Sequence, residues 1–466
     1  MHPRSRSTTR RRHRSEPSQY QRPKGNARAT GPCLRPPVEA TSVEVSAYGV
    51  SASGTVYEIG GQLFEVATSG FAQAIANAHA ARQRPRCQCT PEGVEMYVAR
   101  LAGPHGGYIV KRMPDTGCRH ACDCPSYEPP ADLSGLGQVL GTAINEDPAT
   151  GQTSLRLGFS LTKLPGCSQM PTAGGESESV CTDGTKLSLR GLLHYLWDEA
   201  ELTKWHPGFA GKRTWGTVRR QLLSASEDKF ARGDSLRSRL YIPETFFLDQ
   251  RDAINARRSA QWLQALSAPG KPQSLMLLIG EVKEIVPARF GFKAVVKHVP
   301  DQAFALDHPL YRRLGRRFAT ELALWGACEQ MHMVIIATFS VSERGVPVVS
   351  ELSLMPVTQQ WLPVENACDE QLVDRLVSQG RTFRKGLRYN LPATIPVASA
   401  TLMDTGGEPC SLRISREAEA DTEVPLPTET HQHAHLPQSW VWHPEDGAMP
   451  PLPKKQFFTE TADRRL

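Results

Sequence analysis

Residues 94–113, which read VEMYVARLAGPHGGYIVKRM, decide the fold of the first ordered part of the chain. The runs 94–101 and 108–113 are rich in β-branched and aromatic residues, as half-buried strands are. Between them, residues 102–107 contain three glycines and a proline, which favour a turn. The pattern therefore predicts an antiparallel β-hairpin.

Five of the eleven cysteines of the chain flank this hairpin. They lie before its first strand and after its second, together with one histidine: Cys87, Cys89, Cys118, His120, Cys122 and Cys124. An antiparallel pair brings the residues before its first strand beside those after its second. We therefore expect the two groups to meet at the open end of the hairpin.

Thiolate and imidazole ligands at this open end can close a tetrahedral site of the kind that zinc prefers. Cys118 and His120 would complete a C-x-C…C-x-H set, whereas His120 and Cys124 would complete C-x-C…H-x-x-x-C. The alternative is a group of reduced, partly buried thiols without metal. Four protein ligands would make the zinc structural and not hydrolytic.

The net charge of +6 is concentrated at one end of the chain. Residues 1–30 hold nine Lys and Arg against one acid, a net +8, so the remaining residues carry −2. A basic arm containing Arg10, Arg11, Arg12 and Arg14 could hold a nucleic acid backbone through counterion release. The alternative is an unfolded leader, and translation of residues 1–47 is left open.

No apolar run approaches the roughly 18 residues of a membrane-spanning helix. The basic N-terminal segment is followed by no apolar region of the kind found in secretory signals. We therefore expect a cytoplasmic protein without a membrane partner, whose cysteines are reduced.

The order of the predicted elements indicates a mixed α/β, or α+β, multidomain protein. The chain of 466 residues is long enough for several cores. We expect a disordered basic arm (1–47), a β-rich module with the zinc-type knuckle (48–171), a helical unit (185–250), an α/β domain (251–415) and a loose tail (416–466). Two helices and a strand in 185–250 fit a winged helix or any small helical unit, with Arg219 and Arg220 facing outward for nucleic acid.

The elements expected beyond the hairpin are helices at 70–82, 187–204, 214–223, 251–266, 309–325 and 369–380, and strands at 56–59, 63–66, 155–161, 239–242, 275–285, 292–298, 333–340 and 346–354.

Several stretches resemble a bacterial domain-of-unknown-function family, number 1173, whose members are met on integrative and conjugative elements and plasmids. They are the hairpin strands and the runs CPSYEPP (124–130), LYIPE (240–244), LLIGEVKE (277–284) and FRKGLRYN (383–390). The resemblance covers most of residues 48–415. It implies that Cys87, Cys89, His120 and Cys124 are the recurrent ligand set, and it implies mobile-element cargo without an assigned activity.

One strand suggests a different chemistry. In 275–285, Glu281 and Lys283 would share a face with Leu277, Ile279 and Ile285. A Glu-x-Lys strand is half of a magnesium-dependent nuclease signature, with Glu244 or Asp249 as the second acid. The alternative is a structural pair of opposite charges, which we favour.

The cysteine pattern and the basic arm predict a protein that is stabilised by zinc and binds nucleic acid or a partner protein, and the family resemblance implies that it is associated with a mobile element. The alternative from a different class is a magnesium-dependent nuclease with Glu281 and Lys283 in its active site.

Overall fold

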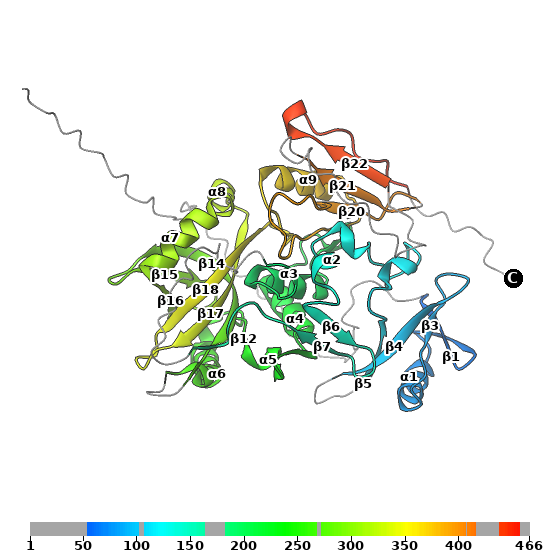
Figure 1. The fold of residues 1–466 in the computed structure, drawn as a ribbon, viewed down its shortest axis with the longest axis horizontal. Helices are drawn as coiled ribbons and strands as arrows, with labels where there is room; N and C mark the ends of the chain where they lie inside the picture. The colour runs from blue at the N-terminus through cyan, green and yellow to red at the C-terminus, as the bar shows by residue number, and fades with distance from the viewer. Residues whose placement is uncertain are drawn as a thin grey trace, which may run out of the picture.

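The computed structural model describes residues 54–101, 107–163, 182–267, 272–406, 408–415 and 438–456. Helices and sheets are mixed along the chain, in agreement with the predicted α+β class (Figure 1). The basic arm 1–47 lies outside the described residues.

The N-terminal sheet is built around the predicted hairpin, which is confirmed. β4 (Val94–Leu101) pairs antiparallel with β5 (Gly107–Arg112), and the strand order is β2-β1-β3-β4-β5. β1 (Val56–Ile59) and β2 (Gln62–Glu65) form a second hairpin across Gly60 and Gly61, both of which have positive φ. The two-residue β3 (Arg86–Cys87) joins the hairpins, and α1 (Phe71–Ala80) packs on the sheet.

A second, larger sheet occupies the C-terminal half of the chain. β14 (Met276–Pro287), β15 (Phe292–Val296), β16 (Ala303–Leu306), β18 (Pro347–Val357) and β17 (His332–Val341) close into a ring, because β17 also pairs with β14. The short β12 (Leu240–Tyr241) adds to β14 in parallel. Helices α6 (Arg251–Trp262), α7 (His308–Arg317) and α8 (Ala319–Ala327) accompany this sheet. The predicted single helix 309–325 is thus two helices, which meet at Phe318.

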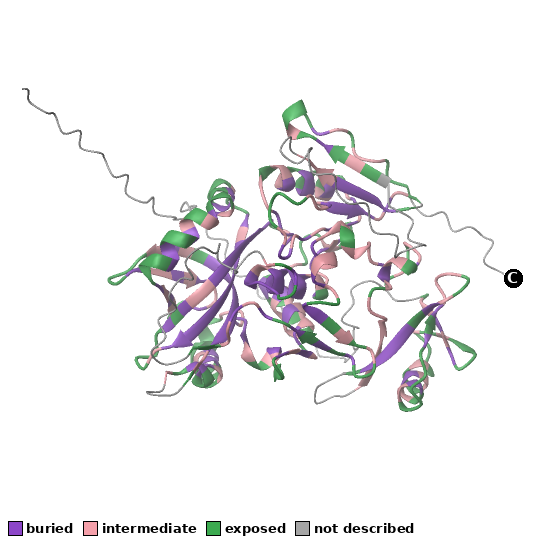
Figure 2. Ribbon diagram, in the orientation of Figure 1, coloured by how far each residue is buried: buried purple, intermediate pink, exposed green. Residues whose placement is uncertain are grey.

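The central strand β14 is buried on both faces over its first seven residues (Figure 2). Met276 and Leu278 enter one apolar core, whereas Leu277 and Ile279 enter another on the opposite side. A β-bulge lies between Val282 and Glu284. Since a bulge shifts the alternation of side chains, Ile285 faces the first core. The predicted common face of Leu277, Ile279 and Ile285 is therefore wrong.

The middle of the chain does not form a sheet of its own. α3 (Leu189–Glu199) and α4 (Trp215–Ala225) begin at Ser188 and Thr214, whose side chains accept backbone N–H bonds. Their neighbouring strands join three different sheets. β9 (Lys204–Trp205) pairs with β19 (Phe383–Lys385), and β12 pairs with β14. β10 (Lys229–Ala231) pairs with β7 (Gln152–Leu155) and β11 (Asp234–Ser235). Strands of two or three residues satisfy few backbone groups alone, which explains why they add to longer neighbours. The winged-helix interpretation of residues 185–250 is therefore not confirmed.

The remaining short elements are two helices and the strands of the smaller sheets. They are α2 (Leu136–Val139), β6 (Ile144–Asp147), β7 (Gln152–Leu155), β8 (Thr162–Lys163), α5 (Leu236–Arg239) and β13 (Gln273–Ser274). The strand predicted at 155–161 is wrong, since β7 ends where that prediction begins.

The predicted loose tail is also corrected in part. α9 (Ala367–Ser378) is followed by β19 (Phe383–Lys385), β20 (Ala400–Leu402) and β21 (Cys410–Ile414), and β22 (Gln438–Trp442) adds in parallel to β21. Trp442 is buried in the large core, which fixes this strand. Residues 416–437 and 457–466 lie outside the described residues.

Across the described ranges, no helix combines the length and the apolar character that a bilayer crossing requires.

Candidate metal centre

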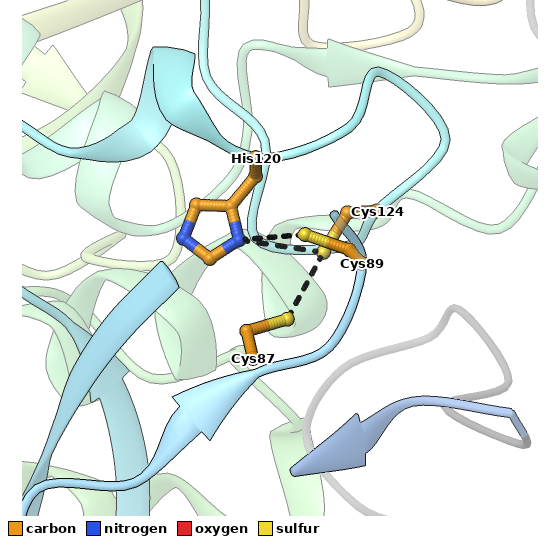
Figure 3. Close-up of side chains that lie close together, drawn as sticks. All are labelled: Cys87, Cys89, His120 and Cys124. Carbon is orange, nitrogen blue, oxygen red and sulfur yellow. Dashed lines mark hydrogen bonds between the residues drawn. The ribbon is translucent and has the colours of Figure 1, made fainter. Parts of the chain in front are cut away.

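Four side chains from the two ends of the hairpin point toward one another (Figure 3). Cys87 ends β3, where it pairs with Tyr57 of β1 and Val94 of β4, and Cys89 follows two residues later. His120 directly follows the 3-10 turn Gly117–Arg119, and Cys124 comes four residues after it. Sheet pairing therefore positions the first two residues, and the turn after β5 positions the other two.

The distances among the four ligand atoms fit a tetrahedral metal ion. All four atoms lie within 4.8 Å of one another. The Cys87 and Cys124 Sγ atoms are 3.8 Å apart, and His120 Nδ1 is 3.3 Å from Cys89 Sγ and 3.7 Å from Cys124 Sγ. A tetrahedral zinc with ordinary bond lengths would place two sulfurs about 3.8 Å apart and a sulfur and a nitrogen about 3.6 Å apart. A disulfide needs an S–S distance of about 2 Å, so these thiols are not paired as disulfides.

The backbone around the four residues is arranged to support negative sulfur. The N–H of Ala121 donates to Cys89 Sγ at 3.5 Å, and the N–H of Ser126 donates to Cys124 Sγ at 3.4 Å. The turn is tight: a Cβ on Gly117 would lie 2.7 Å from the Cβ of Glu128, so only glycine fits there. The turn thus offers N–H groups to two of the ligands.

The thiols also influence one another's ionisation. Hydrogen bonds with Cys124 and Cys87 lower the pKa of Cys89 far below its usual range. Hydrogen bonds with Cys124 and Cys89 raise the pKa of Cys87. Cys89 is therefore the first of the group to become a thiolate, the form that binds a metal.

His120 contributes one ring nitrogen to the group. Its side chain is buried at 3% exposure, and Nδ1 faces the sulfurs. Within the described part of the chain, Nε2 has no hydrogen-bond partner. Nδ1 meets only weak sulfur partners, so a metal ion would supply the strong contact that this buried nitrogen otherwise lacks.

The structure also separates the two ligand sets that the sequence left open. Cys118 and Cys122 are half-buried free thiols outside the four-residue group. Burial raises the pKa of both, which keeps them as neutral thiols. The set that includes His120 and Cys124 is the one that the fold assembles.

The segment after Cys124 connects this centre to the body of the protein. Glu128 accepts from Arg112 of β5 at 2.6 Å and from Arg384 of β19 at 2.7 Å. Arg384 also contacts Asp198 of α3 at 2.7 Å. Burial alone would raise the pKa of Glu128, but Arg112 and Arg384 outweigh burial and lower it below its usual range. Sequence reasoning missed this network, because residues in direct contact within it, Glu128 and Arg384, are 256 residues apart.

The predicted nucleic-acid residues fall into two groups. Arg10, Arg11, Arg12 and Arg14 lie outside the described residues. Arg220 is exposed on α4, as predicted, whereas Arg219 is half-buried and donates from Nε to the Ile242 carbonyl at 3.1 Å. Arg219 thus joins α4 to the segment after β12, which explains why it does not face outward.

The expected pair of Glu281 and Lys283 is wrong. Glu281 is 3% exposed and binds Lys297 of the segment after β15 and His332 of β17. Lys283 lies at the bulge and is exposed. The sequence placed Glu281 on an apolar strand and so indicated that it needs a partner of opposite charge. Only the sheet pairing shows that the partners are Lys297 and His332. Of the two suggested second acids, Glu244 pairs with Arg257 and Asp249 is exposed.

Comparisons with known proteins identify the family of the chain. A family model described as "Protein of unknown function (DUF1173)" matches residues 57–445. No curated protein and no solved structure matches the chain.

Proposed function

Because the chain belongs to the DUF1173 family, whose description assigns no function, we propose from its own residues that it is a zinc-stabilised binding or accessory protein. One structural Zn²⁺ would be held by Cys87, Cys89, His120 and Cys124. The observation that carries this proposal is the set of four ligand atoms within 4.8 Å of one another, contributed by two segments that the hairpin joins.

The donor set favours a structural ion over a catalytic one. Three thiolates and one imidazole complete a tetrahedron, so no coordination position is left for water or substrate. Zinc would fix the turn after β5 against β3. It would thereby hold Glu128 where it meets Arg112 and Arg384. The metal would thus shape a module and set its position on the body of the protein.

We further propose that the bound partner is a nucleic acid or another protein of a mobile element. Support for the first comes from the +8 charge of residues 1–30, because clustered basic residues bind phosphate backbones through counterion release. Support for the mobile-element setting comes from the family resemblance alone. The magnesium nuclease is not proposed, because Glu281 is engaged by Lys297 and His332 while Lys283 faces solvent.

Elemental analysis tests the metal proposal directly. The full chain is purified without added metal, and the zinc content is measured by mass spectrometry together with titration of the free thiols. We expect one zinc per chain and protection of three thiols that react only after chelation or unfolding. A zinc content near zero, with every thiol freely reactive, would refute the proposal.

Two cysteine variants provide a matched comparison. Cys124→Ala removes a ligand and should abolish stoichiometric zinc, whereas Cys122→Ser alters a thiol two residues away and should retain it. If Cys122→Ser loses the metal and Cys124→Ala keeps it, a different ligand set binds zinc. A hydrogen-exchange comparison of both variants shows whether the loss is confined to the region around the hairpin.

A further inference from the structure

A second group of polar side chains lies at one end of the ring of strands, where β15 and β18 end and β17 begins. Glu281 lies within β14, and His332 is the first residue of β17. Lys297 and His298 follow β15, and Trp361 lies in the turn after β18. None of these residues takes part in the candidate metal centre.

Glu281 orients His332. His332 Nδ1 is 2.6 Å from Glu281 Oε1, and Glu281 is ionised because His332 and Lys297 outweigh the effect of burial and lower its pKa. A carboxylate can only accept a hydrogen bond, so Nδ1 carries the proton. In the neutral ring Nε2 is then an acceptor, as in other carboxylate–histidine pairs. The His332 side chain is 21% exposed, and its ring stacks on Trp361 with centroids 4.3 Å apart.

Lys297 binds the same Glu281 oxygen as His332, and His298 follows Lys297 in the chain. His298 Nδ1 accepts from the Phe246 N–H at 3.3 Å, so the proton of the neutral ring lies on Nε2. In the described part of the chain, no hydrogen bond engages that Nε2–H. Lys297 contacts Glu281, but its ammonium has three N–H groups and its side chain is 29% exposed. Around Glu281, His332 therefore offers an acceptor, and Lys297 and His298 offer donors.

The backbone at this place is strained, which a purely structural ion pair does not require. His298 has φ +68° and Trp361 has φ +60°, a region that bulky side chains rarely adopt. Both rings flank Trp215, at centroid distances of 6.0 and 5.7 Å. Strained residues of this kind persist at sites where a fixed side-chain position is needed.

We propose that this cluster is a binding site for a phosphate group that carries a protonated oxygen. The Nε2 lone pair of His332 accepts the P–O–H hydrogen, and Lys297 and the Nε2–H of His298 donate to the other phosphate oxygens. The buried Glu281 holds His332 in the required tautomer and does not touch the ligand. The proposal is independent of the zinc centre and of its function.

Inorganic phosphate and sulfate separate this site from a general anion site. Both are tetrahedral anions, but at neutral pH phosphate has an O–H and sulfate has none. The histidine rings of the full chain are isotopically labelled, and the His332 and His298 ring signals, assigned by substitution, are followed during titration with each anion. We expect saturable shifts of both signals with phosphate and at least about tenfold weaker binding of sulfate, the loss of one hydrogen bond to a charged group.

Glycerol 3-phosphate is added in a third titration, which is run beside inorganic phosphate at about pH 6 so that the ester also carries a protonated oxygen. This comparison identifies the source of the phosphate. Tighter binding of the ester than of inorganic phosphate would assign the site to an organic phosphate, and the reverse order would assign it to the free ion. Either order supports the proposal. Equal binding of all three anions, or an absence of saturable shifts, would overturn it.

Lys297, directly after β15, and Lys283, within β14, provide matched variants. Lys297→Met should weaken phosphate binding by about tenfold or more, whereas Lys283→Met, at the exposed bulge, should change it less than about twofold. Equal effects of the two would contradict the proposed site.

His298→Gly is a second test, which still applies if Lys297→Met does not fold. Glycine adopts φ +68° without strain, so the variant should fold while losing the donor. A folded His298→Gly protein with unchanged phosphate affinity would also overturn the proposal.

Discussion

The N-terminal sheet and the large C-terminal sheet are stabilised in different ways. The described core of the first consists of eight residues, and one of them, Cys87, belongs to the candidate metal centre. The second sheet is buried on both faces by large aliphatic and aromatic side chains from several helices. Small cores commonly need a metal or disulfide, whereas large apolar cores do not. The comparison indicates that zinc would stabilise one region of the protein and leave the other independent of it.

Removal of the metal is the strongest test of this difference. Zinc binding in small zinc-dependent domains contributes on the order of 10 kcal/mol to folding. We expect chelation to raise hydrogen exchange throughout β1, β3, β4 and β5, while β14 and β17 remain protected. Hydrogen exchange measured by mass spectrometry on peptides from both sheets shows which of them loses protection when the metal is removed. Uniform loss of protection would show that the two regions form one cooperative unit.

A core substitution in the large sheet should have the converse effect. Phe339 is fully buried and contacts the rings of Trp262, Tyr241 and Phe304. Phe339→Ala should reduce the free energy of unfolding by about 3–5 kcal/mol, through lost burial and a cavity. The variant should still bind one zinc per chain. Chemical denaturation, combined with zinc analysis, measures both; release of the metal would contradict the separation.

The contact between the two regions can be weakened without touching either core. Glu128→Gln removes the charge that Arg112 and Arg384 share, and should cost about 1–3 kcal/mol because it leaves these guanidinium groups partly unpaired. The zinc content should not change. Thermal unfolding of the variant beside the wild type measures the loss.

The same carboxylate should make this contact sensitive to acid. The pKa of Glu128 is lower in the folded protein than the usual value of about 4.3, so its contribution is complete above that pH. As the pH falls through the lower folded value, the contribution is lost. The stability difference between wild type and Glu128→Gln should therefore shrink below about pH 4. A difference that stays constant with pH would mean that the amide NH2 facing the two guanidinium groups, and not the lost charge, is responsible.

Deletion of residues 1–47 should have the smallest effect on either region. Residues 1–30 of the arm carry a net charge of +8 and the rest of the chain −2, so removal of the arm should abolish salt-dependent binding to nucleic acid while the melting temperature stays within error. Gel shifts across a salt series compare the two chains. Unchanged affinity after the deletion would point instead to the exposed Arg220 of α4.

The sequence was sufficient to predict features that depend on neighbouring residues. The β-branched and aromatic residues of 94–101 and 108–113, with the glycines between them, predicted the hairpin, and the hairpin predicted that the flanking cysteines meet. The choice of His120 and Cys124 among the flanking candidates followed from the family resemblance. Local patterns were sufficient here because the two ends of a hairpin are brought together by the hairpin itself.

Only the tertiary structure decided the contacts between distant segments. The bulge at Lys283 separated it from Glu281, and sheet pairing supplied Lys297 and His332 in its place. Likewise, residues 438–442 of the predicted loose tail form β22, because they pair with β21. In each case the structure is stabilised by burial and hydrogen bonds between segments that are far apart in the chain. The periodicity of a single segment does not show which other segment it pairs with.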